Sequence, residues 1–419
     1  MSKLEELIQK LCPNGVEYKT FEDFSIQLTG MSGVSNKWAE TGNCVFIDYM
    51  NAYTHLKIDT TLIKKATVKN LRQTILQKGD ILFTSASEVP DECAISSVIE
   101  NDIQDGVFLD DHLFGIRILE KYRTEINSTF LNYYFRGIEF RKIVQKAVRG
   151  VTRFYISKKD FMKIKIPIPP IEVQEEIVRI LDKFTELSAE LTAELTAELT
   201  ARKKQYEFYR DKLILEQENV EYKTLGEIAT EMYRGSGIKR DELTPEGISC
   251  VRYGEIYTTY DVWFDKCVSH TNEQAITSKK YFENGDILFA ITGESVEEIA
   301  KSCAYTGNNK CLAGGDIVVM KHKQNPKYLA YALSTTDAQR QKSYGKIKSK
   351  VVHASVPSIK LISIPLPPLA VQEKIASILD NFHSLVTDIS EGLPAEIEAR
   401  QKQYEYYRDK LLNFKEIAQ

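Results

Sequence analysis

The chain contains one long pattern twice. The segment IPIPPIEVQEEIVRILDKF (residues 166–184) returns as IPLPPLAVQEKIASILDNF (residues 364–382), a shift of 198 positions. The same shift carries RKKQYEFYRDKLI (202–214) onto RQKQYEYYRDKLL (400–412) without a gap. A repeat of this length constrains the fold strongly, because both copies are expected to adopt one structure. The sequence therefore predicts a molecule with pseudo-two-fold symmetry.

Two shorter blocks extend the repeat toward the amino terminus. VEYKTFEDF from Val16 matches VEYKTLGEI from Val220, and KGDILFTSASE from Lys78 matches NGDILFAITGE from Asn284. Their offsets differ by several residues, so the loops between the blocks differ in length. With 419 residues, the chain is long enough for two or three domains. We expect a first body at 1–168, a long helix at 169–218, a second body at 219–366 and a second long helix at 367–419.

The two bodies have the pattern of mixed α/β domains. Short β-rich runs such as CVFIDYM, DILFTS, DILFAIT and DIVVMK are bounded by Gly, Asn and Asp, which are typical turn residues. Residues 127–148 and 325–343 predict amphipathic helices late in each body. Neither body shows regular β-α-β spacing, so the expected fold class is mixed α+β rather than a doubly wound sheet.

The repeated segments predict long helices. Each begins near a Pro-Pro pair, which the first helical turn tolerates. Apolar residues then follow at steps of three and four, flanked by charged residues, which is typical of a coiled coil. The natural partner of each helix is the other copy, in antiparallel orientation. Pro394 lies inside the second helix and predicts a bend or a break there.

Composition excludes several classes of protein. Seven cysteines without a C-x-x-C pair suggest neither a disulfide framework nor a standard zinc site. The first residues lack an apolar signal core, and no run reaches about 18 apolar residues. We therefore expect a cytoplasmic protein that does not enter a membrane.

Catalytic motifs are absent from the sequence. There is no G-x-x-x-x-G-K-[ST], no G-x-G-x-x-G after a strand, no H-E-x-x-H and no Asn-Pro-Pro-aromatic or Asp-Pro-Pro-aromatic motif. The E-x-K triplets at Glu17 and Glu221 give little support to a nuclease interpretation, because both precede the GDIL aspartates. We expect no catalytic residue, no metal site and no cofactor on this chain.

Charge is segregated along the chain. The formal net charge is −4, yet residues 136–165 hold ten Lys/Arg against two Asp/Glu, and residues 321–360 hold nine against one. Such segments favour nucleic-acid contact, although a solvated surface is the simpler interpretation for any single lysine.

The doubled IPxPPxxxQExI and KQYExYRDKL motifs, with variable bodies between them, closely resemble the specificity subunit of type I restriction-modification systems. The resemblance covers essentially the whole chain. It implies a non-enzymatic subunit with two target-recognition domains, each reading one half of a bipartite site in double-stranded DNA.

The resemblance also implies partners. Two modification subunits would bind S-adenosylmethionine and methylate adenine, and restriction subunits would use ATP and Mg²⁺ to translocate and cut DNA. These cofactors belong to the partners, and this chain itself is expected to bind none.

Candidate site residues follow from the basic segments and the repeat. For DNA binding we predict Arg149, Arg153, Tyr155, Lys158, Lys346, Lys348, Lys350 and His353. For partner binding we predict Gln174, Gln205, Arg210, Gln372, Gln403 and Arg408, with packing inside the helix pair as the alternative. The repeated tyrosines at 206, 209, 404 and 407 favour the helix core over partner contact.

Two rival functions are open at this stage. One is a fused methyltransferase or nuclease that reads its own site, which the missing motifs disfavour. The other is a structural coiled-coil adaptor, which the basic bodies disfavour.

The repeat SAELTAELTAELTA (188–201) generates a prediction about spacing. Deleting one TAEL unit shortens a helix by about 6 Å, whereas DNA rises by about 3.4 Å per base pair. We expect both half-sites to be kept and the unspecified spacer to lose about one or two base pairs. Mapping the methylated motif of the deletion variant measures this, and an unchanged spacer contradicts it.

Overall fold

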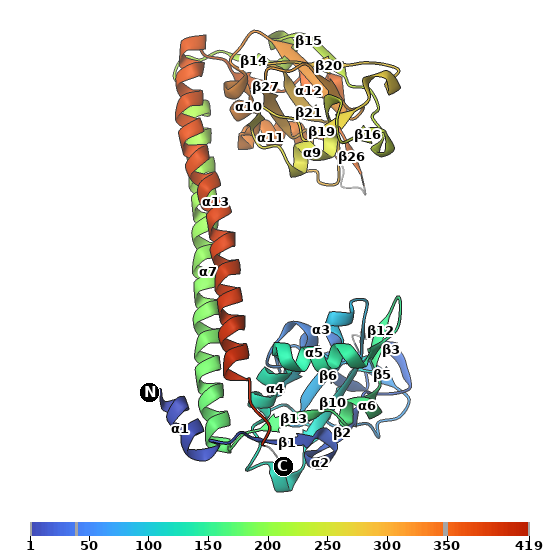
Figure 1. The fold of residues 1–419 in the computed structure, drawn as a ribbon. Coiled ribbons are helices and arrows are strands. Elements are labelled where there is room, and N and C mark those ends of the chain that lie inside the picture. Colours follow the sequence, from blue (N-terminus) through green and yellow to red (C-terminus); the bar gives the residue numbers. More distant parts are fainter. Residues whose placement is uncertain (1, 38–40, 347–350, 418–419) are drawn as a thin grey trace. The chain divides into compact units, whose positions relative to one another are not determined.

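The computed structural model describes residues 2–37, 41–346 and 351–417 (Figure 1). The chain divides into two compact units. Unit 1 comprises Met1–Glu194 and Glu396–Gln419, and unit 2 comprises Leu195–Ala395. Each unit therefore contains a mixed α/β body and a part of both long helices. This division differs from the predicted one, in which each helix was a separate segment.

Unit 1 contains two four-stranded sheets and two smaller ones. The first sheet has the order β2-β10-β6-β8, and the second β3-β5-β4-β9. The bounds are β2 Ser25–Thr29, β10 Leu113–Ile118, β6 Ile81–Thr84, β8 Ser96–Val98, β3 Val34–Lys37, β5 Lys64–Val68, β4 Cys44–Ile47 and β9 Val107–Leu109. The smaller sheets are β1 (Glu17–Thr20) with β13 (Lys165–Ile168), and β11 (Val148–Arg149), β12 (Phe154–Ile156) and β7 (Ala86–Ser87) in the order β11-β12-β7.

Short helices complete the body of unit 1. They are α1 Lys3–Leu11, α2 Phe21–Phe24, α3 Tyr49–Thr54, α4 Ser128–Arg136, α5 Ile138–Ala147 and α6 Lys158–Met162, with 3-10 turns at Pro90–Glu92 and Glu120–Tyr122. The core gathers aromatic rings from α2, α4, α5, α6 and the first sheet, among them Phe21, Phe83 and Phe161.

Unit 2 repeats this plan. Its first sheet has the order β15-β25-β21-β23-β18, which matches β2-β10-β6-β8 with one strand added. The strands are β15 Ala229–Arg234, β25 Ile317–His322, β21 Ile287–Ala290, β23 Ser302–Tyr305 and β18 Trp263–Phe264. A second sheet has the order β16-β19-β17-β24-β20, with bounds Leu243–Thr244, Ser269–Thr271, Ile248–Val251, Cys311–Ala313 and Tyr281–Phe282. The smaller pairs are β14 (Tyr222–Thr224) with β27 (Ser363–Pro365), and β22 (Thr292–Gly293) with β26 (Val352–His353).

The helices of unit 2 occupy equivalent places in the repeat. They are α8 Leu225–Ile228, α9 Tyr253–Thr258, α10 Pro326–Ser334, α11 Thr336–Ser343 and α12 Val356–Lys360, with 3-10 turns at Arg240–Glu242 and Glu273–Ala275. The predicted mixed α+β class and the internal repeat are confirmed.

The amphipathic segments predicted at 127–148 and 325–343 each form two helices rather than one. An extended residue, Gly137 in unit 1 and Thr335 in unit 2, ends the first helix and caps the second. Because the chain turns there, the second helix begins with free backbone N–H groups that need an acceptor.

The long helices are α7 (Ile171–Leu215) and α13 (Leu369–Leu411). α7 runs without interruption through the TAEL repeat. α13 also runs through Pro394 without a break, whereas a bend at this proline stays a prediction. A proline removes one helix hydrogen bond and strains the preceding turn, but the helical stretches on both sides continue across it.

The apolar stripe of each long helix has two uses. Near the start of α7, Ile177 and Leu181 pack into the core of the adjoining body, in a cluster that also includes Leu411 of α13. Ile375 and Leu379 of α13 do the same in unit 2. Further along, rings from both helices meet. Phe184 lies 6.4 Å from Tyr407 in unit 1, in the antiparallel sense that the sequence predicted.

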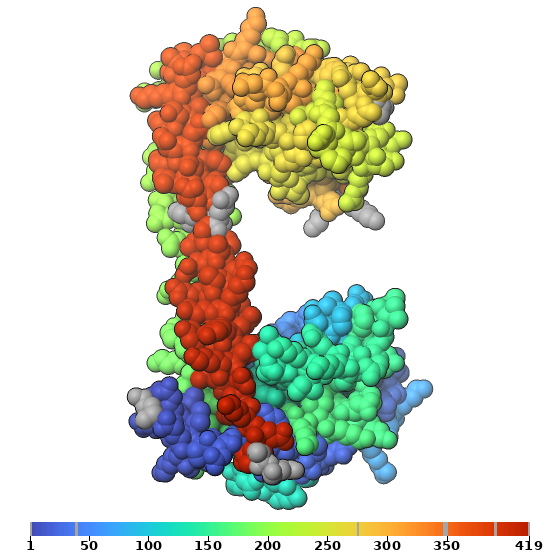
Figure 2. Space-filling model, viewed as in Figure 1, coloured from blue at the N-terminus to red at the C-terminus, as the bar shows by residue number. Residues whose placement is uncertain are grey.

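The carboxyl-terminal segment completes unit 1. The backbone N–H of Val16 donates to the Lys415 carbonyl over 2.8 Å, and the N–H of Ile417 donates to the Val16 carbonyl over 3.1 Å. The space-filling view shows this red segment against the blue amino-terminal residues (Figure 2). Among the described residues, no helix is long and apolar enough to span a bilayer.

Candidate nucleic-acid interface

A β-hairpin carries three of the predicted DNA-binding residues of unit 1. Strands β11 and β12 pair Val148 with Ile156 and Arg149 with Tyr155. Because strand side chains alternate, Ile156 is buried while Arg149 and Tyr155 share the outer face. Arg153 is exposed in the turn that joins the strands. The hairpin therefore presents two guanidinium groups and one phenol to solvent.

The hairpin adjoins β7 and helix α3. Tyr155 pairs with Ala86, whose carbonyl accepts a hydrogen bond from the Tyr49 hydroxyl over 3.3 Å. Tyr53 stacks on Tyr49 with centroids 5.9 Å apart. Burial raises the pKa of the Tyr49 hydroxyl, and the nearby charge of Arg153 opposes this rise. We call residues 148–156, with β7 and α3, the β7–β12 surface.

The fourth predicted residue of unit 1 lies just beyond the hairpin. Lys158 begins α6 and is half-buried, with its ammonium 5.9 Å from the centre of the Phe114 ring. Its aliphatic stem therefore packs inward. Lys158 therefore follows the β7–β12 surface directly in sequence, but its half-buried side chain packs partly against the body.

The equivalent surface of unit 2 consists of β22, β26 and α9, and we call it the β22–β26 surface. Thr292 pairs with His353, and the Thr292 hydroxyl lies 3.2 Å from the His353 Nδ1. His353 is exposed, and Lys346 is half-buried just after α11. The predicted residues Lys348 and Lys350 lie outside the described residues. The structure thus shows two of the four predicted residues.

Several cations of the basic segments bond to backbone carbonyl groups of their own body. The Arg136 guanidinium donates to the carbonyls of Ser96 (2.7 Å) and His55 (2.9 Å), and burial lowers the pKa of Arg136 to about 10. Lys342 donates to the Leu333 carbonyl over 2.8 Å, and burial lowers the pKa of Lys342 to about 7. The charge counted along the sequence therefore exceeds the charge available to a ligand.

Two predicted partner-binding residues are fully buried. The Gln174 side chain accepts from the Asn127 N–H (2.9 Å) and donates to the Pro169 carbonyl (2.6 Å). Gln372 makes the same bonds to Asn325 (3.0 Å) and Pro367 (2.8 Å). These amides join the start of each long helix to its body. Their burial is at odds with the predicted partner contact.

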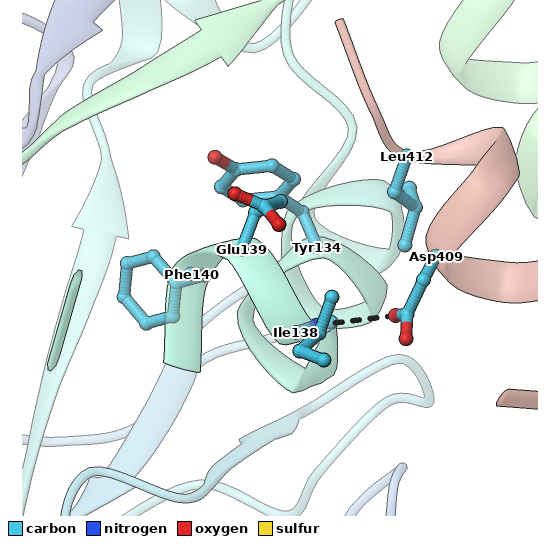
Figure 3. Close-up of a pocket in the computed structure, with 7 residues that line it drawn as sticks. Tyr134, Ile138, Glu139, Phe140, Asp409 and Leu412 are labelled. Carbon is cyan, nitrogen blue, oxygen red and sulfur yellow. Dashed lines mark hydrogen bonds between the residues drawn. The ribbon is translucent and has the colours of Figure 1, made fainter. Parts of the chain in front are cut away.

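Arg210 and Arg408 also have structural roles. Arg408 donates to Asp409 over 3.0 Å, and Asp409 accepts from the Ile138 N–H over 3.1 Å at the start of α5 (Figure 3). Likewise Arg210 donates to Asp211 over 2.8 Å, and Asp211 accepts from the Thr336 N–H over 3.0 Å at the start of α11. Each arginine thus holds an aspartate that caps the second helix of a pair.

Gln205 and Gln403 are exposed, so they stay candidates for partner binding. Gln403 lines a groove between the long helices in unit 1. The groove has a volume of about 250 Å³ and is formed by Phe184, Leu187, Ser188, Leu191, Arg400, Gln403, Tyr404 and Tyr407. We call it the helix groove. Of the repeated tyrosines, Tyr206 and Tyr404 are half-buried as predicted, whereas Tyr209 and Tyr407 are exposed.

One repeated hydrogen bond between a tyrosine and an aspartate was not predicted from the sequence. The Tyr133 hydroxyl donates to Asp182 over 2.6 Å, and the Tyr331 hydroxyl donates to Asp380 over 2.7 Å. Each aspartate also pairs with a lysine, Lys57 at 2.8 Å and Lys327 at 2.7 Å. Applying the 198-residue shift to Tyr133 and Asp182 would have identified Tyr331 and Asp380 as their repeats.

One acidic cluster among the described residues has atoms close enough for a metal ion, namely Asp110, Asp111 and His112. The Lys37 ammonium lies 3.0 Å from an Asp110 carboxylate oxygen and also contacts Asp111 and His112. This lysine already supplies a positive charge to the cluster. The arrangement therefore offers no argument for a metal.

Comparison with known proteins bears directly on the repeat. The sequence matches the type I restriction modification DNA specificity domain twice, over residues 23–201 and 217–399. The chain belongs to the type I restriction-modification DNA specificity family. The two matched segments of this chain cover most of each body and part of the long helix that follows it.

Relatives and solved structures agree with this membership. A type I restriction enzyme specificity subunit of Escherichia coli is 35% identical over 272 residues, which cover 62% of this chain and 66% of the relative. A Haemophilus influenzae protein described as a putative specificity subunit is 33% identical over 300 residues, which cover 70% of this chain and 74% of the relative.

Two solved structures share the fold. A chain from a structural study of assembly in a type I restriction-modification system aligns with a TM-score of 0.73 at 14% identity, covering 96% of this chain and 99% of its own. The specificity subunit of Thermoanaerobacter tengcongensis aligns with a TM-score of 0.55 at 16% identity, covering 97% and 99%.

The β7–β12 surface generates a prediction about DNA affinity. We expect the Arg149→Ala, Arg153→Ala double variant to bind duplex DNA roughly tenfold more weakly, because each lost phosphate contact forfeits counterion release. The slope of log affinity against log salt should fall by about one for each arginine. Fluorescence anisotropy over a salt series measures both quantities.

Lys142→Ala is the matched control, since Lys142 is an exposed cation on α5 paired with Glu139 at 2.9 Å. An unchanged affinity and slope in the double variant would show that the hairpin does not meet DNA.

Proposed function

We propose that this chain is the DNA-reading subunit of a type I restriction-modification complex and that each unit reads one half of a bipartite target. The observation that carries the proposal is the repetition of one surface. Both units place a short strand pair beside a Tyr-containing helix, at the end of a basic segment. Two related but non-identical surfaces suit two different half-sites.

In this proposal, different exposed groups contact different parts of the DNA. Arg149 and Arg153 would bind phosphates and position the hairpin, because guanidinium groups match phosphate geometry. Tyr155, with 53% of its surface exposed, would face the groove. A two-stranded ribbon fits the major groove, which is about 12 Å wide and displays a distinct pattern for each base pair.

The long helices would carry the catalytic partners. Residues that line the helix groove of unit 1 recur in unit 2, where Phe382, Leu385 and Tyr209 stand 198 positions from Phe184, Leu187 and Tyr407. Tyr209 and Phe382 lie 6.2 Å apart, much as Phe184 and Tyr407 do. Two equivalent apolar sites suit two copies of one partner, and we assign them to two modification subunits.

Catalysis in this proposal belongs to other chains. The modification subunits would bind S-adenosylmethionine and methylate adenine, and restriction subunits would use ATP and Mg²⁺. This chain would contribute recognition and assembly only. Incubating the purified chain with DNA and labelled S-adenosylmethionine tests the rival enzyme, since methyl transfer by the chain alone would require a catalytic site on it.

Mapping methylated adenines tests the reading function. We expect cells that express this chain with its modification subunits to methylate a motif of two short half-sites separated by unspecified bases, since each unit reads separately. Sequencing that detects methylated adenine reports both half-sites at once. Cells with the modification subunits alone are the control. A single uninterrupted motif would contradict reading by two units.

The helix groove generates a prediction about stoichiometry. Leu187 and Leu385 are 49% and 60% exposed, so a partner can cover them. Arginine at either position would place an unpaired charge in an apolar contact and weaken that site by at least about tenfold. Native mass spectrometry should find two modification subunits on the wild-type chain, one on each single variant and none on the double variant.

The control for this experiment is Glu190→Arg, an exposed position on α7 that does not line the helix groove. Two bound partners on the double leucine variant would place the docking sites elsewhere.

A further inference from the structure

We propose that Val151, at the tip of the β11–β12 hairpin, contacts the C5 methyl group of a thymine in the major groove and so contributes to the base preference of the first half-site. The inference rests on the proposed DNA-reading function and names one chemical feature that the first unit reads.

Exposure singles out Val151. Its side chain is 88% exposed, and among the large apolar side chains of the described residues only Tyr344 equals it. A single exposed apolar residue is ordinary on a protein surface. Val151 differs in its setting, because it stands in the turn of a hairpin between the exposed side chains of Arg149 and Arg153.

The backbone holds Val151 away from the core. Gly150 has φ +123°, and a Cβ at this position would lie 2.0 Å from the Arg153 carbonyl oxygen, so only glycine fits this turn. The buried positions of the hairpin are already taken by Ile156 and, in part, by Val148. Val151 therefore projects at the tip, where its two methyl groups meet solvent.

The chemistry around the tip favours DNA over another apolar partner. Arg149 and Arg153 are exposed on either side of Val151. Cations beside a small apolar tip suit a groove with phosphate walls and one apolar feature on its floor. In the major groove that feature is the thymine C5 methyl, which valine-sized side chains can contact, and the minor groove has no such group.

The test removes the two contacting groups in turn. Once the methylated motif is mapped, each thymine of the first half-site is replaced by deoxyuridine, which lacks only the C5 methyl. For the wild-type complex, we expect one replacement to weaken binding about fourfold, the value of one buried methyl. The complex with Val151→Ser should bind the thymine duplex more weakly by a similar factor. Replacing the thymine by deoxyuridine should not weaken the binding of this variant further.

Two controls separate this inference from other causes. Val268→Ser changes another exposed valine, 57% exposed in unit 2, and should leave the first half-site unaffected. Thermal unfolding should show equal stability for wild type and Val151→Ser, because Val151 makes little contact with the core.

The outcomes distinguish the two levels of the proposal. A wild-type complex that neither binds nor methylates a bipartite site overturns the proposed function itself. A normal wild-type complex together with an unchanged Val151→Ser motif, or with equal deoxyuridine effects in both proteins, overturns only the thymine contact.

Discussion

Buried side-chain amides at the start of the two long helices hold each helix to its body. Gln174 and Gln372 are fully enclosed, and each spans a backbone N–H and a backbone carbonyl. A buried polar group left without its partner costs about 1–3 kcal/mol, so these amides strongly favour one arrangement of helix and body. The same arrangement occurs in both units because the same residues are repeated. The two bodies are therefore mounted on their helices in one way.

The aspartates near the far ends of the helices add a second constraint. Asp409 caps α5 in unit 1 and Asp211 caps α11 in unit 2, so each body depends on residues from both long helices. In unit 1 the contributing residue comes from the end of the chain, more than two hundred positions from the rest of the body. The hydrogen bonds of Val16 with Lys415 and Ile417 also join the carboxyl-terminal segment to the body of unit 1. Unit 1 is thus complete only when the last helix is in place.

Much of the architecture follows from patterns in the sequence. The 198-residue shift predicted two related halves, and the three- and four-residue apolar spacing predicted α7 and α13. For the candidate site, the sequence did not indicate which of the chosen residues are exposed. Arg149, Arg153 and Tyr155 do share one exposed hairpin, but Gln174 and Gln372, chosen because they are repeated, are internal. Repetition marks a residue as needed in both halves and does not say whether a partner or the fold needs it.

Sequence patterns therefore sufficed for the repeat, the fold class and the helical character of the TAEL segment, because these depend on composition and on spacing along the chain. Which residues are buried could be determined only from the folded structure. Arg136 and Arg153 belong to one basic segment, yet Arg136 is half-buried and bonded to backbone carbonyls, whereas Arg153 is exposed in an open turn. Which face of a helix or hairpin becomes covered depends on elements far away in sequence, and local charge or spacing carries no record of those contacts.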